Sequence, residues 1–379
     1  MDFDFTDDQE MLRDSVRKWV DKGYDFERRR AIVKQGGFSR EAWGELAGLG
    51  LTGLHVAEAH GGMGFGPVDA MVVMEELGRG LVLEPFAQGA LIAGKVLSQA
   101  PQAMQAAWLP KIAGGEALVV LAHQERGARY RLNHVATAAK GSGASWTVSG
   151  AKSIVPVGDQ ADAFIVPARV SGAVDDAAGV ALFLVERSAA GVATRGYPTQ
   201  DGARAAEVTL NDAPAALIVP AGEGFGALER AVDVGIAAVC AEAVGAMDKL
   251  VALTVEYMNT RKQFGVPIAT FQALRHRIAD VKMQLELGRS MSYYASLKLD
   301  DAPEQRRRAL SQAKLQLGQS MRFVGQQCIQ LHGGIGVTDE YIGSHYFKRL
   351  TVMEMTFGDT MHHTGEVSRR MQETAGVFG

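Results

Sequence analysis

Apolar residues recur at helical spacing through the first 115 residues of the chain. Near the start, Thr6 and Gln9 have the spacing of a capping box, which marks the first turn of a helix. Leu12 and Val16 then lie on one face of that helix. We therefore expect a helical domain over residues 1–115. Further helices are expected around residues 40–49, 67–80 and 86–107, separated by glycine-rich turns.

The pattern changes near Gly114-Gly115 to short runs of β-branched and other apolar residues. Runs such as 163–170 and 179–185 are bounded by glycine, aspartate and proline, at intervals typical of a small sandwich or barrel. We expect one β domain over residues 116–221.

Helical periodicity returns after Gly222, in stretches much longer than those of the first domain. Long helices joined by short loops predict an antiparallel bundle over residues 222–379. The fold class is therefore α+β multidomain, with an N-terminal helical domain, a middle β-barrel or sandwich and a C-terminal helical bundle. The long helices are expected at about 224–260, 268–299, 303–331 and 345–375.

Composition narrows the classes of function. The 39 basic and 43 acidic residues give a net charge of -4, so the chain lacks the basic field that attracts nucleic acid. No apolar run is long enough for membrane insertion, and the acidic N-terminus lacks the features of a signal peptide. The two cysteines, Cys240 and Cys328, lie in apolar helical sequence and are expected to be buried thiols. We expect a cytoplasmic protein without a metal site.

Two local patterns in the last domain suggest a phosphate-containing ligand. Arg261-Lys262-Gln263-Phe264-Gly265 stands at a predicted helix end, and Gln330-Leu331-His332-Gly333-Gly334-Ile335-Gly336 stands where another helix stops. A guanidinium suits a pyrophosphate, and glycines let backbone amides approach it closely. The same residues also fit a solvated arginine and an ordinary glycine-terminated helix.

These patterns belong to an ordered set that resembles the acyl-CoA dehydrogenase superfamily over essentially the whole chain. The resemblance implies a C-terminal four-helix bundle, FAD, a tetramer, and α,β-dehydrogenation of acyl-CoA thioesters with electron-transfer flavoprotein as the expected acceptor. The motifs that carry it, in family order, are Gly-Gly-Met-Gly at 61–64, Met-Glu-Glu-Leu-Gly-Arg at 74–79, Trp-Leu-Pro-Lys at 108–111, Gly222–Phe225, Arg261–Gly265 and Gln330–Gly336.

The resemblance also implies which residues contact FAD. In the family, the ADP half of FAD is held partly by a neighbouring subunit's Arg-x-x-Phe-Gly and Gln-x-x-Gly-Gly elements, and a Phe-Gln dipeptide gives a further contact. The matching residues here are Arg261, Phe264, Gly265, Gln272, Gln330, Gly333 and Gly334.

The sequence departs from the family at the catalytic base. The family usually carries a glutamate in a Tyr-Glu-Gly-Thr segment, and the matching stretch places Phe357 at the glutamate position, where it cannot accept a proton. Some members carry the base on the first bundle helix, at a position that is about Gly235 here, with Asp233 nearby. Asp359 is the only carboxylate beside the usual position, and it fits either a displaced base or a helix N-cap.

The flavin-side motifs are altered as well. The family's Thr-Glu-Pro-Gly-x-Gly-Ser-Asp segment appears as Gln124–Arg131, in which Glu125 is expected to be structural. Its Trp-Ile-Thr flavin contact appears as Ile154-Val155-Pro156, and an arginine often found on the first bundle helix is Ile236.

Three hypotheses follow. The chain is a self-sufficient acyl-CoA dehydrogenase with Asp359 as base, or a non-catalytic subunit of a heteromeric one, or a flavin-free structural or binding protein on the same fold. The second resembles the degenerate subunits of bacterial heterotetramers that act on steroid side chains, and the small subunits of pimeloyl-CoA dehydrogenases. Flavin content of the chain alone and with a partner subunit separates the three.

Overall fold

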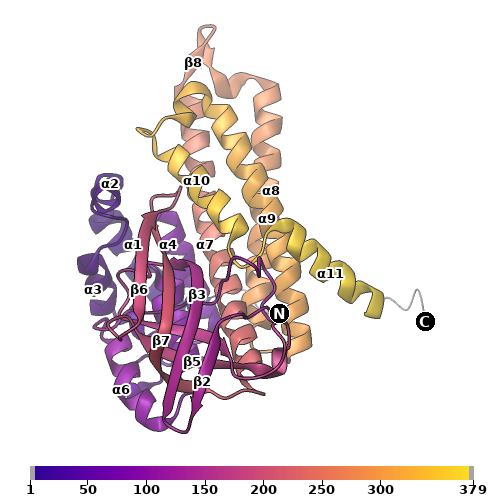
Figure 1. The fold of residues 1–379 in the computed structure, drawn as a ribbon. Helices are drawn as coiled ribbons and strands as arrows, with labels where there is room; N and C mark the ends of the chain where they lie inside the picture. Colours follow the sequence, from indigo (N-terminus) through magenta and orange to yellow (C-terminus); the bar gives the residue numbers. More distant parts are fainter. Residues whose placement is uncertain (1–4, 375–379) are drawn as a thin grey trace. The chain divides into compact units, whose positions relative to one another are not determined.

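The structure, a computed structural model, describes residues 5–374, and its element order is helices, then strands, then helices (Figure 1). This order confirms the predicted fold class. The N-terminal helices are α1 (Asp7–Gly23), α2 (Phe26–Lys34), α3 (Arg40–Gly48), α4 (Pro67–Arg79), α5 (Ala93–Leu97) and α6 (Gln102–Ala113), with a π-helical segment at Ala87–Ile92. Within the described residues, no helix is both long and apolar enough to cross a membrane.

The chain forms two compact units, and each draws on helices from the first 115 residues. Among the described residues, one unit combines residues 5–31, Pro67–Val82 and residues 236–374. The other combines Ile32–Gly66 with Leu83–Gly235.

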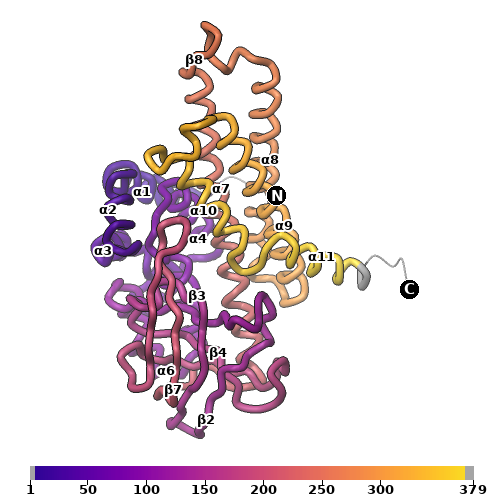
Figure 2. Tube along the Cα trace, turned by 45° about the horizontal axis from the view of Figure 1, so that its top comes forward, coloured from indigo at the N-terminus to yellow at the C-terminus, as the bar shows by residue number. Residues whose placement is uncertain are grey.

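The strands of the second unit close into a barrel. Strands β2, β3, β7, β5 and β4 pair in a ring, because β4 pairs with both β5 and β2. The tube in Figure 2 shows β2, β3, β4 and β7 gathered in the same part of the chain trace. Strand β1 extends the ring at β4 and β6 extends it at β7. A closed ring resolves the choice between sandwich and barrel left open by the sequence. The strands are β1 (Val119–Leu121), β2 (Ala138–Ser142), β3 (Ser145–Pro156), β4 (Ala163–Arg169), β5 (Val180–Glu186), β6 (Val192–Pro198) and β7 (Arg204–Val219).

A buried ion pair lies inside the barrel unit. Lys152 Nζ donates to Glu125 Oε1 at 2.7 Å and to the Pro167 carbonyl at 2.8 Å. Thr137 Oγ1 donates to the same Glu125 oxygen at 2.7 Å. Burial alone would raise the pKa of Glu125, but Lys152 and the hydrogen bonds together lower it. The structural role expected for Glu125 is therefore what the structure shows.

The first unit contains the long C-terminal helices (Figure 1). The stretch predicted as one helix at about 345–375 is two helices, so that prediction was wrong. The break occurs because Phe357 and Gly358 have φ values of 58° and 113°, which a right-handed helix cannot contain. The helices are α7 (Gly224–Thr260), α8 (Gln272–Lys298), α9 (Pro303–His332), α10 (Ile342–Met355) and α11 (Thr360–Thr374), with a hairpin of β8 (Lys262–Gln263) and β9 (Val266–Pro267) between α7 and α8.

Helices α4 and α7 cross with their backbones in contact. A Cβ atom added at Gly245 would lie 1.8 Å from the Glu75 carbonyl oxygen, and one added at Gly78 would lie 2.1 Å from the Glu242 carbonyl oxygen. Only glycine allows so close an approach at these two positions. The contact explains why the Met74–Arg79 motif contains a glycine.

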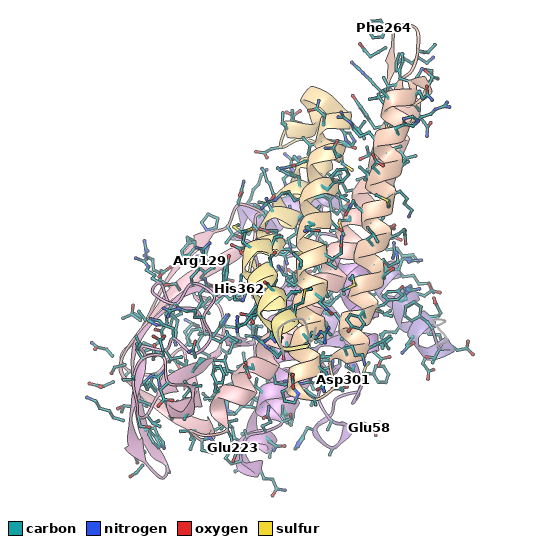
Figure 3. All side chains as sticks on the ribbon, turned by 90° about the vertical axis from the view of Figure 1, so that its right-hand side faces the viewer. Glu58, Arg129, Glu223, Phe264, Asp301 and His362 are labelled. Atoms are coloured by element: carbon teal, nitrogen blue, oxygen red, sulfur yellow. The ribbon has the colours of Figure 1, made fainter. Side chains whose placement is uncertain are left out.

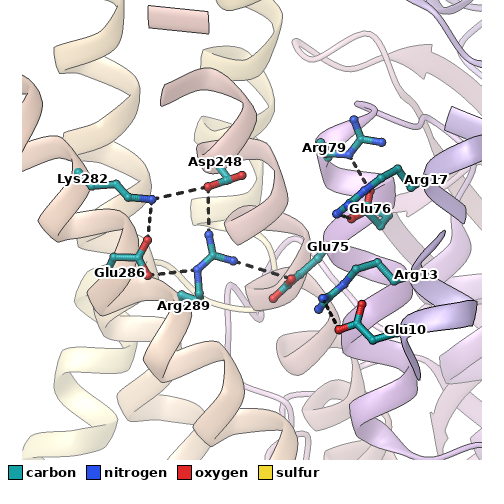
Figure 4. Close-up of polar contacts among 10 residues, drawn as sticks. All are labelled: Glu10, Arg13, Arg17, Glu75, Glu76, Arg79, Asp248, Lys282, Glu286 and Arg289. Atoms are coloured by element: carbon teal, nitrogen blue, oxygen red, sulfur yellow. Dashed lines mark hydrogen bonds and ion pairs between the residues drawn. The ribbon is translucent and has the colours of Figure 1, made fainter. Parts of the chain in front are cut away.

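The close crossing buries carboxylates, and arginines surround them (Figure 4). Glu76 accepts from Arg17 at 2.6 Å and from Arg79 at 2.6 Å. Glu75 is nearly covered, its Oε1 has no hydrogen-bond partner among the described residues, and its ion pair with Arg289 has a long N–O separation of 3.9 Å. Burial raises the pKa of Glu75 to about 7.

Replacing Gly245 by alanine should destabilise the chain. The added methyl group overlaps the backbone of α4, which cannot move without disturbing the packed helices, so we expect a loss of about 1–3 kcal/mol in the free energy of unfolding. Urea unfolding followed by circular dichroism measures it. Gly226→Ala on the same helix is the matched control, because no atom lies within 4 Å of its added Cβ. Equal stability of the two variants would contradict the backbone contact.

Replacing Glu75 by glutamine should make stability less dependent on pH. Folding raises the pKa of Glu75 from 4.5 to about 7, so the folded chain holds this proton more tightly than the unfolded chain. Stability therefore falls as pH rises from the unfolded pKa through the folded one, by roughly 3 kcal/mol in total. We expect Glu75→Gln to exceed wild type in stability above neutral pH and to lose this advantage below about pH 5. Parallel unfolding curves at both pH values test this, and a pH-independent difference would refute it.

Candidate functional site

The residues expected to contact FAD gather at one end of the helical bundle. Met258 on α7, Ile268 after the hairpin and Leu331 on α9 form a small buried cluster there. Arg261 and Gln330 are close neighbours of these residues in sequence, and both are exposed. The cluster therefore brings the two motifs, which are about 70 residues apart in sequence, to the same end of the bundle.

The hairpin between α7 and α8 projects an aromatic ring into solvent. Phe264 is 94% exposed at the tip of the hairpin, where Figure 3 labels it. Its φ is 53°, and Gly265 follows with φ 81°. The backbone of Arg261 closes the base of the hairpin, since its carbonyl accepts from Ile268 N at 2.8 Å. An exposed aromatic ring held on a fixed turn is suited to packing against a flat group from outside the chain.

The end of α9 is held by His332, a residue that the sequence analysis did not single out. Its Nδ1 donates to the Cys328 carbonyl at 2.8 Å, which leaves Nε2 to accept from the Tyr341 hydroxyl at 2.8 Å. Its ring also packs against Tyr257, with centroids 4.7 Å apart. Burial lowers the pKa of His332 and favours the neutral ring that this arrangement needs. A histidine directly before two glycines was the available signal in the sequence.

The glycines after His332 leave the backbone accessible. Gly333 has φ 64° and ψ -140°, a conformation that only glycine adopts readily, and it ends α9. Gly334 has no positive φ, and no atom lies within 4 Å of a Cβ added there. No packing inside the chain therefore requires glycine at position 334, and the space beside its α-carbon is open to an external group.

The ADP end of FAD fits this end of the bundle. The exposed Arg261 could pair with a pyrophosphate, and no atom crowds the α-carbons of Gly333 and Gly334. Gln272 and Gln330 are exposed and offer amide donors and acceptors. Four large apolar side chains in the same segments are also exposed: Phe264, Val266, Ile335 and Val337.

The turn that matches the family's base segment lies elsewhere on the bundle. It joins α10 to α11 and contacts α9 at Lys314, a buried residue whose Nζ donates to the carbonyls of Glu354 at 2.8 Å and Gly358 at 2.9 Å. Lys314 precedes Leu331 by 17 residues, about 25 Å along α9. The predicted cofactor residues and the predicted base position of one chain are therefore well separated.

Buried side chains hold this turn on two sides. Lys314 reaches it from α9, and burial lowers its pKa to about 8. His363 from α11 lies 3.1 Å from the Phe357 carbonyl, and burial lowers the pKa of His363 so that the ring is neutral. Phe357 thereby keeps a left-handed backbone, which costs energy for a bulky residue. Lys314 was missed from the sequence, although it falls on the apolar face with Leu310 and Leu317.

The carboxylates near the turn accept hydrogen bonds from α11. Asp359 Oδ1 accepts from His362 N at 2.7 Å, which is N-cap geometry for the helix that begins at Thr360. Glu354 Oε1 accepts from Thr360 N at 2.9 Å and from Thr360 Oγ1 at 2.5 Å. Figure 3 labels His362 on α11.

At the other positions where family members carry a base or a flavin contact, this chain has different residues. Gly235 is buried in α7, and the neighbouring Asp233 is fully buried in the same helix. Ile154 lies in a bulge of β3 with φ 53° and an exposed aliphatic side chain. In the Gln124–Arg131 segment, Arg126 pairs with Glu207 and Arg131 with Asp175. The residues that match the family's flavin contacts therefore do not fit the flavin ring as its usual residues would.

Metal chemistry has no counterpart among the described residues. No group of three or more histidine, cysteine, aspartate or glutamate side chains that the structure describes is placed to hold a metal ion. Cys240 and Cys328 are buried free thiols, as predicted.

Relatives of this chain include bacterial and mitochondrial acyl-CoA dehydrogenases. Acyl-CoA dehydrogenase FadE27 of Mycobacterium tuberculosis is 27% identical, over 99% of this chain and 100% of that protein. The long-chain specific mitochondrial acyl-CoA dehydrogenase of Sus scrofa is 28% identical, over 89% of this chain and 80% of that protein.

Solved structures give the same picture. A chain from a variant of the Tcur3481-Tcur3483 steroid ACAD superposes with a TM-score of 0.88 at 28% identity, covering 97% of this chain and 98% of that one. A chain of the ChsE4-ChsE5 complex from Mycobacterium tuberculosis superposes with a TM-score of 0.88 at 26% identity, covering 99% and 100%. These confirm the expected resemblance to subunits of heteromeric steroid enzymes.

The family models match in the order that the motifs predicted. The acyl-CoA dehydrogenase N-terminal domain matches residues 6–116, the middle domain 121–213 and the C-terminal domain 222–372. This chain therefore belongs to the acyl-CoA dehydrogenase family of FAD-dependent oxidoreductases.

Proposed function

We propose that this chain is a subunit of a heteromeric acyl-CoA dehydrogenase that contributes contacts to the ADP half of FAD and lacks a catalytic base of its own. The observation that carries the proposal is the contrast between two regions of one bundle. The exposed end has an arginine, open glycine backbone and accessible amides, whereas the base turn has Phe357 at the glutamate position.

The base turn is poorly suited to proton abstraction. Dehydrogenation removes a proton from the α-carbon of the thioester. The flavin, when bound, accepts the hydride that leaves the β-carbon. A phenyl ring cannot take the proton. Asp359 already accepts the His362 N–H at the start of α11, so its carboxylate is engaged as the cap of that helix. We therefore place the base in the partner subunit.

In this proposal, the end of the bundle that carries Arg261 and Gln330 forms part of an FAD site that the partner subunit completes. Arg261, Gln330 and Gly334 are exposed, so they are accessible to a group outside the chain's own bundle. In this proposal they hold the pyrophosphate and adenosine of FAD, whose flavin lies in a partner that retains the usual flavin contacts. Phe264 and Gln272 complete the surface.

The substrate in this proposal is an acyl-CoA thioester of lipid or steroid catabolism, with electron-transfer flavoprotein as acceptor. The support is similarity to chains from a steroid ACAD and from the ChsE4-ChsE5 complex. The assembly is a heterotetramer, and the protein works in the cytoplasm.

The second candidate function is a self-sufficient dehydrogenase with Asp359 as base. Its support is that Asp359 stands two positions from Phe357 on the same turn. Purification of the chain alone and with its partner distinguishes the two. Flavin content and turnover by the chain alone would favour the second candidate, and a flavin-free chain even in the presence of a partner would favour a structural homologue.

Replacing Arg261 by alanine should weaken FAD retention in the assembled enzyme. A charge-assisted hydrogen bond contributes about 1.5–3 kcal/mol, so the dissociation constant of FAD should rise by roughly tenfold to a hundredfold. Release of FAD on dilution, followed by flavin fluorescence, measures it. Lys262→Ala removes the same charge from the next residue and should have a smaller effect. Equal effects of the two variants would show that only net charge matters and would contradict the assignment.

Replacing Asp359 by asparagine should leave turnover of the complete complex near wild type. Asparagine is as good an N-cap as aspartate, so the variant removes the basic carboxylate and preserves α11. Asp359→Ala is the companion variant, expected to lose about 1 kcal/mol of stability and to keep turnover. A loss of several orders of magnitude in kcat for Asp359→Asn, with flavin content unchanged, would make this chain catalytic and overturn the proposal.

A further inference from the structure

The segment between helices α9 and α10 is exposed along most of its length. It runs from Gly333 to Glu340, and its first five residues form a short 3-10 helix. Ile335 and Val337 in this helix are 45% and 72% exposed. The structure describes all eight residues of the segment, and among them only Gly336 is buried. Contacts at the two ends therefore have to hold its shape. We call residues 333–340 the glycine loop.

A side-chain contact joins the two ends of the glycine loop. His332, the last residue of α9, is buried, and its Nε2 lies 2.8 Å from the Tyr341 hydroxyl. The two rings also pack together, with centroids 4.9 Å apart. Because the two residues are nine positions apart, their contact brings the start and the end of the loop together. The His332 ring also packs against Tyr257 of α7, which connects the closed loop to the end of the bundle.

The hydrogen bond of this contact runs from Tyr341 to His332. A carbonyl can only accept, so His332 Nδ1 carries the proton that it donates to the Cys328 carbonyl at 2.8 Å. Burial lowers the pKa of His332, so the ring is neutral and Nε2 is left as an acceptor. The Tyr341 hydroxyl then has to be the donor. Without it, a buried ring nitrogen loses its partner, which costs more than the loss of an exposed hydrogen bond.

The start of α10 is shaped to receive the Tyr341 ring. A Cβ atom added at Gly343 would lie 2.7 Å from Tyr341 Cε1, so a side chain at position 343 would displace the ring. The Tyr341 carbonyl accepts from Ser344 N at 3.2 Å and from Ser344 Oγ at 3.1 Å. His345 Nε2 donates to the Asp339 carbonyl at 3.0 Å, inside the glycine loop. The first turn of α10 therefore fixes both the ring and the backbone that leads to it.

We propose that His332 is a positioning residue for the cofactor, and that its contact with Tyr341 holds the glycine loop in the shape that receives the ADP half of FAD. The inference deepens the proposed function and rests on it, because the proposed FAD contact includes Gly333 and Gly334. His332 and Tyr341 act through the loop and need no contact with FAD. A loop that is closed for only a fraction of the time binds FAD with a dissociation constant raised by the inverse of that fraction.

Replacing Tyr341 by phenylalanine in the assembled enzyme tests the contact. The variant keeps the ring beside Gly343 and removes only the hydroxyl donor. We expect the dissociation constant of FAD, measured by flavin fluorescence on dilution, to rise by roughly threefold to tenfold, the scale of one neutral hydrogen bond. Tyr346→Phe is the matched control, since its hydroxyl donates to the Arg79 carbonyl on α4 and not to the glycine loop. It should leave FAD retention unchanged.

A rescue experiment separates positioning from a general structural role of His332. In His332→Gln the amide oxygen reaches about as far as Nε2 and can accept from Tyr341, so FAD retention should stay close to wild type. His332→Leu offers no acceptor and should weaken FAD retention as much as Tyr341→Phe does. The double variant His332→Leu/Tyr341→Phe should be no weaker than either single variant, because both remove the same bond. Additive effects, or no rescue by glutamine, would overturn the proposal.

Hydrogen exchange reports on the loop independently of FAD affinity. In the assembled enzyme freed of FAD by dilution, amides of residues 333–340 should exchange faster in Tyr341→Phe than in wild type, because the loop opens more often. Faster exchange together with weaker FAD retention supports the proposal. Weaker retention without faster exchange would mean that the hydroxyl touches FAD itself, and would overturn the positioning role.

Arg261→Ala separates failure of this inference from failure of the proposed function. If Arg261→Ala weakens FAD retention and Tyr341→Phe does not, the role of His332 is overturned while the proposed FAD site stands. If neither variant changes FAD retention, the proposed FAD site at this end of the bundle is overturned, and the role of His332 with it.

Discussion

The contact between the backbones of α4 and α7 is the constraint on which the helical unit depends. Gly78 and Gly245 each leave room for a carbonyl of the other helix, at distances that no side chain would permit. Helices that approach so closely bring their flanking side chains into a confined space. Glu75, Glu76 and Glu242 are buried there. Glu76 pairs closely with arginines, whereas Glu75 has only a distant one, and burial raises its pKa to about 7. Arg349 pairs with Glu242, with N–O distances of 2.6 and 2.8 Å.

The same bundle presents two regions with different chemistry. Its end carries exposed polar groups and open glycine backbone, which suit an external anionic ligand. Its α10–α11 turn is closed by Lys314 and His363, which occupy the carbonyls of residues 354, 357 and 358. A turn held so firmly keeps Phe357 in a strained conformation. The chain has this turn but no carboxylate at position 357. That combination fits a subunit that keeps the fold of an enzyme while another subunit carries out the proton transfer.

Buried charge in the barrel serves a different purpose. Lys152 and Glu125 face one another inside the unit, and both also bond to the protein around them. Such a pair adds little stability compared with apolar residues, but removal of either partner leaves the other uncompensated. In the segment that resembles the family's flavin-contact motif, the barrel itself holds Glu125 through these bonds, and Arg126 and Tyr130 stand at other positions of the segment.

The sequence by itself determined the order of helices and strands and the family, because periodicity and local motifs record them directly. It did not determine the break at Phe357, since a left-handed residue held by Lys314 and His363 has no local signature. The sequence left open whether Asp359 is a helix N-cap or a catalytic base. The hydrogen bond from His362 that defines the cap exists only once α11 has formed. Closure of the barrel and burial of Glu75 likewise required tertiary structure, because both depend on contacts between segments far apart in the chain.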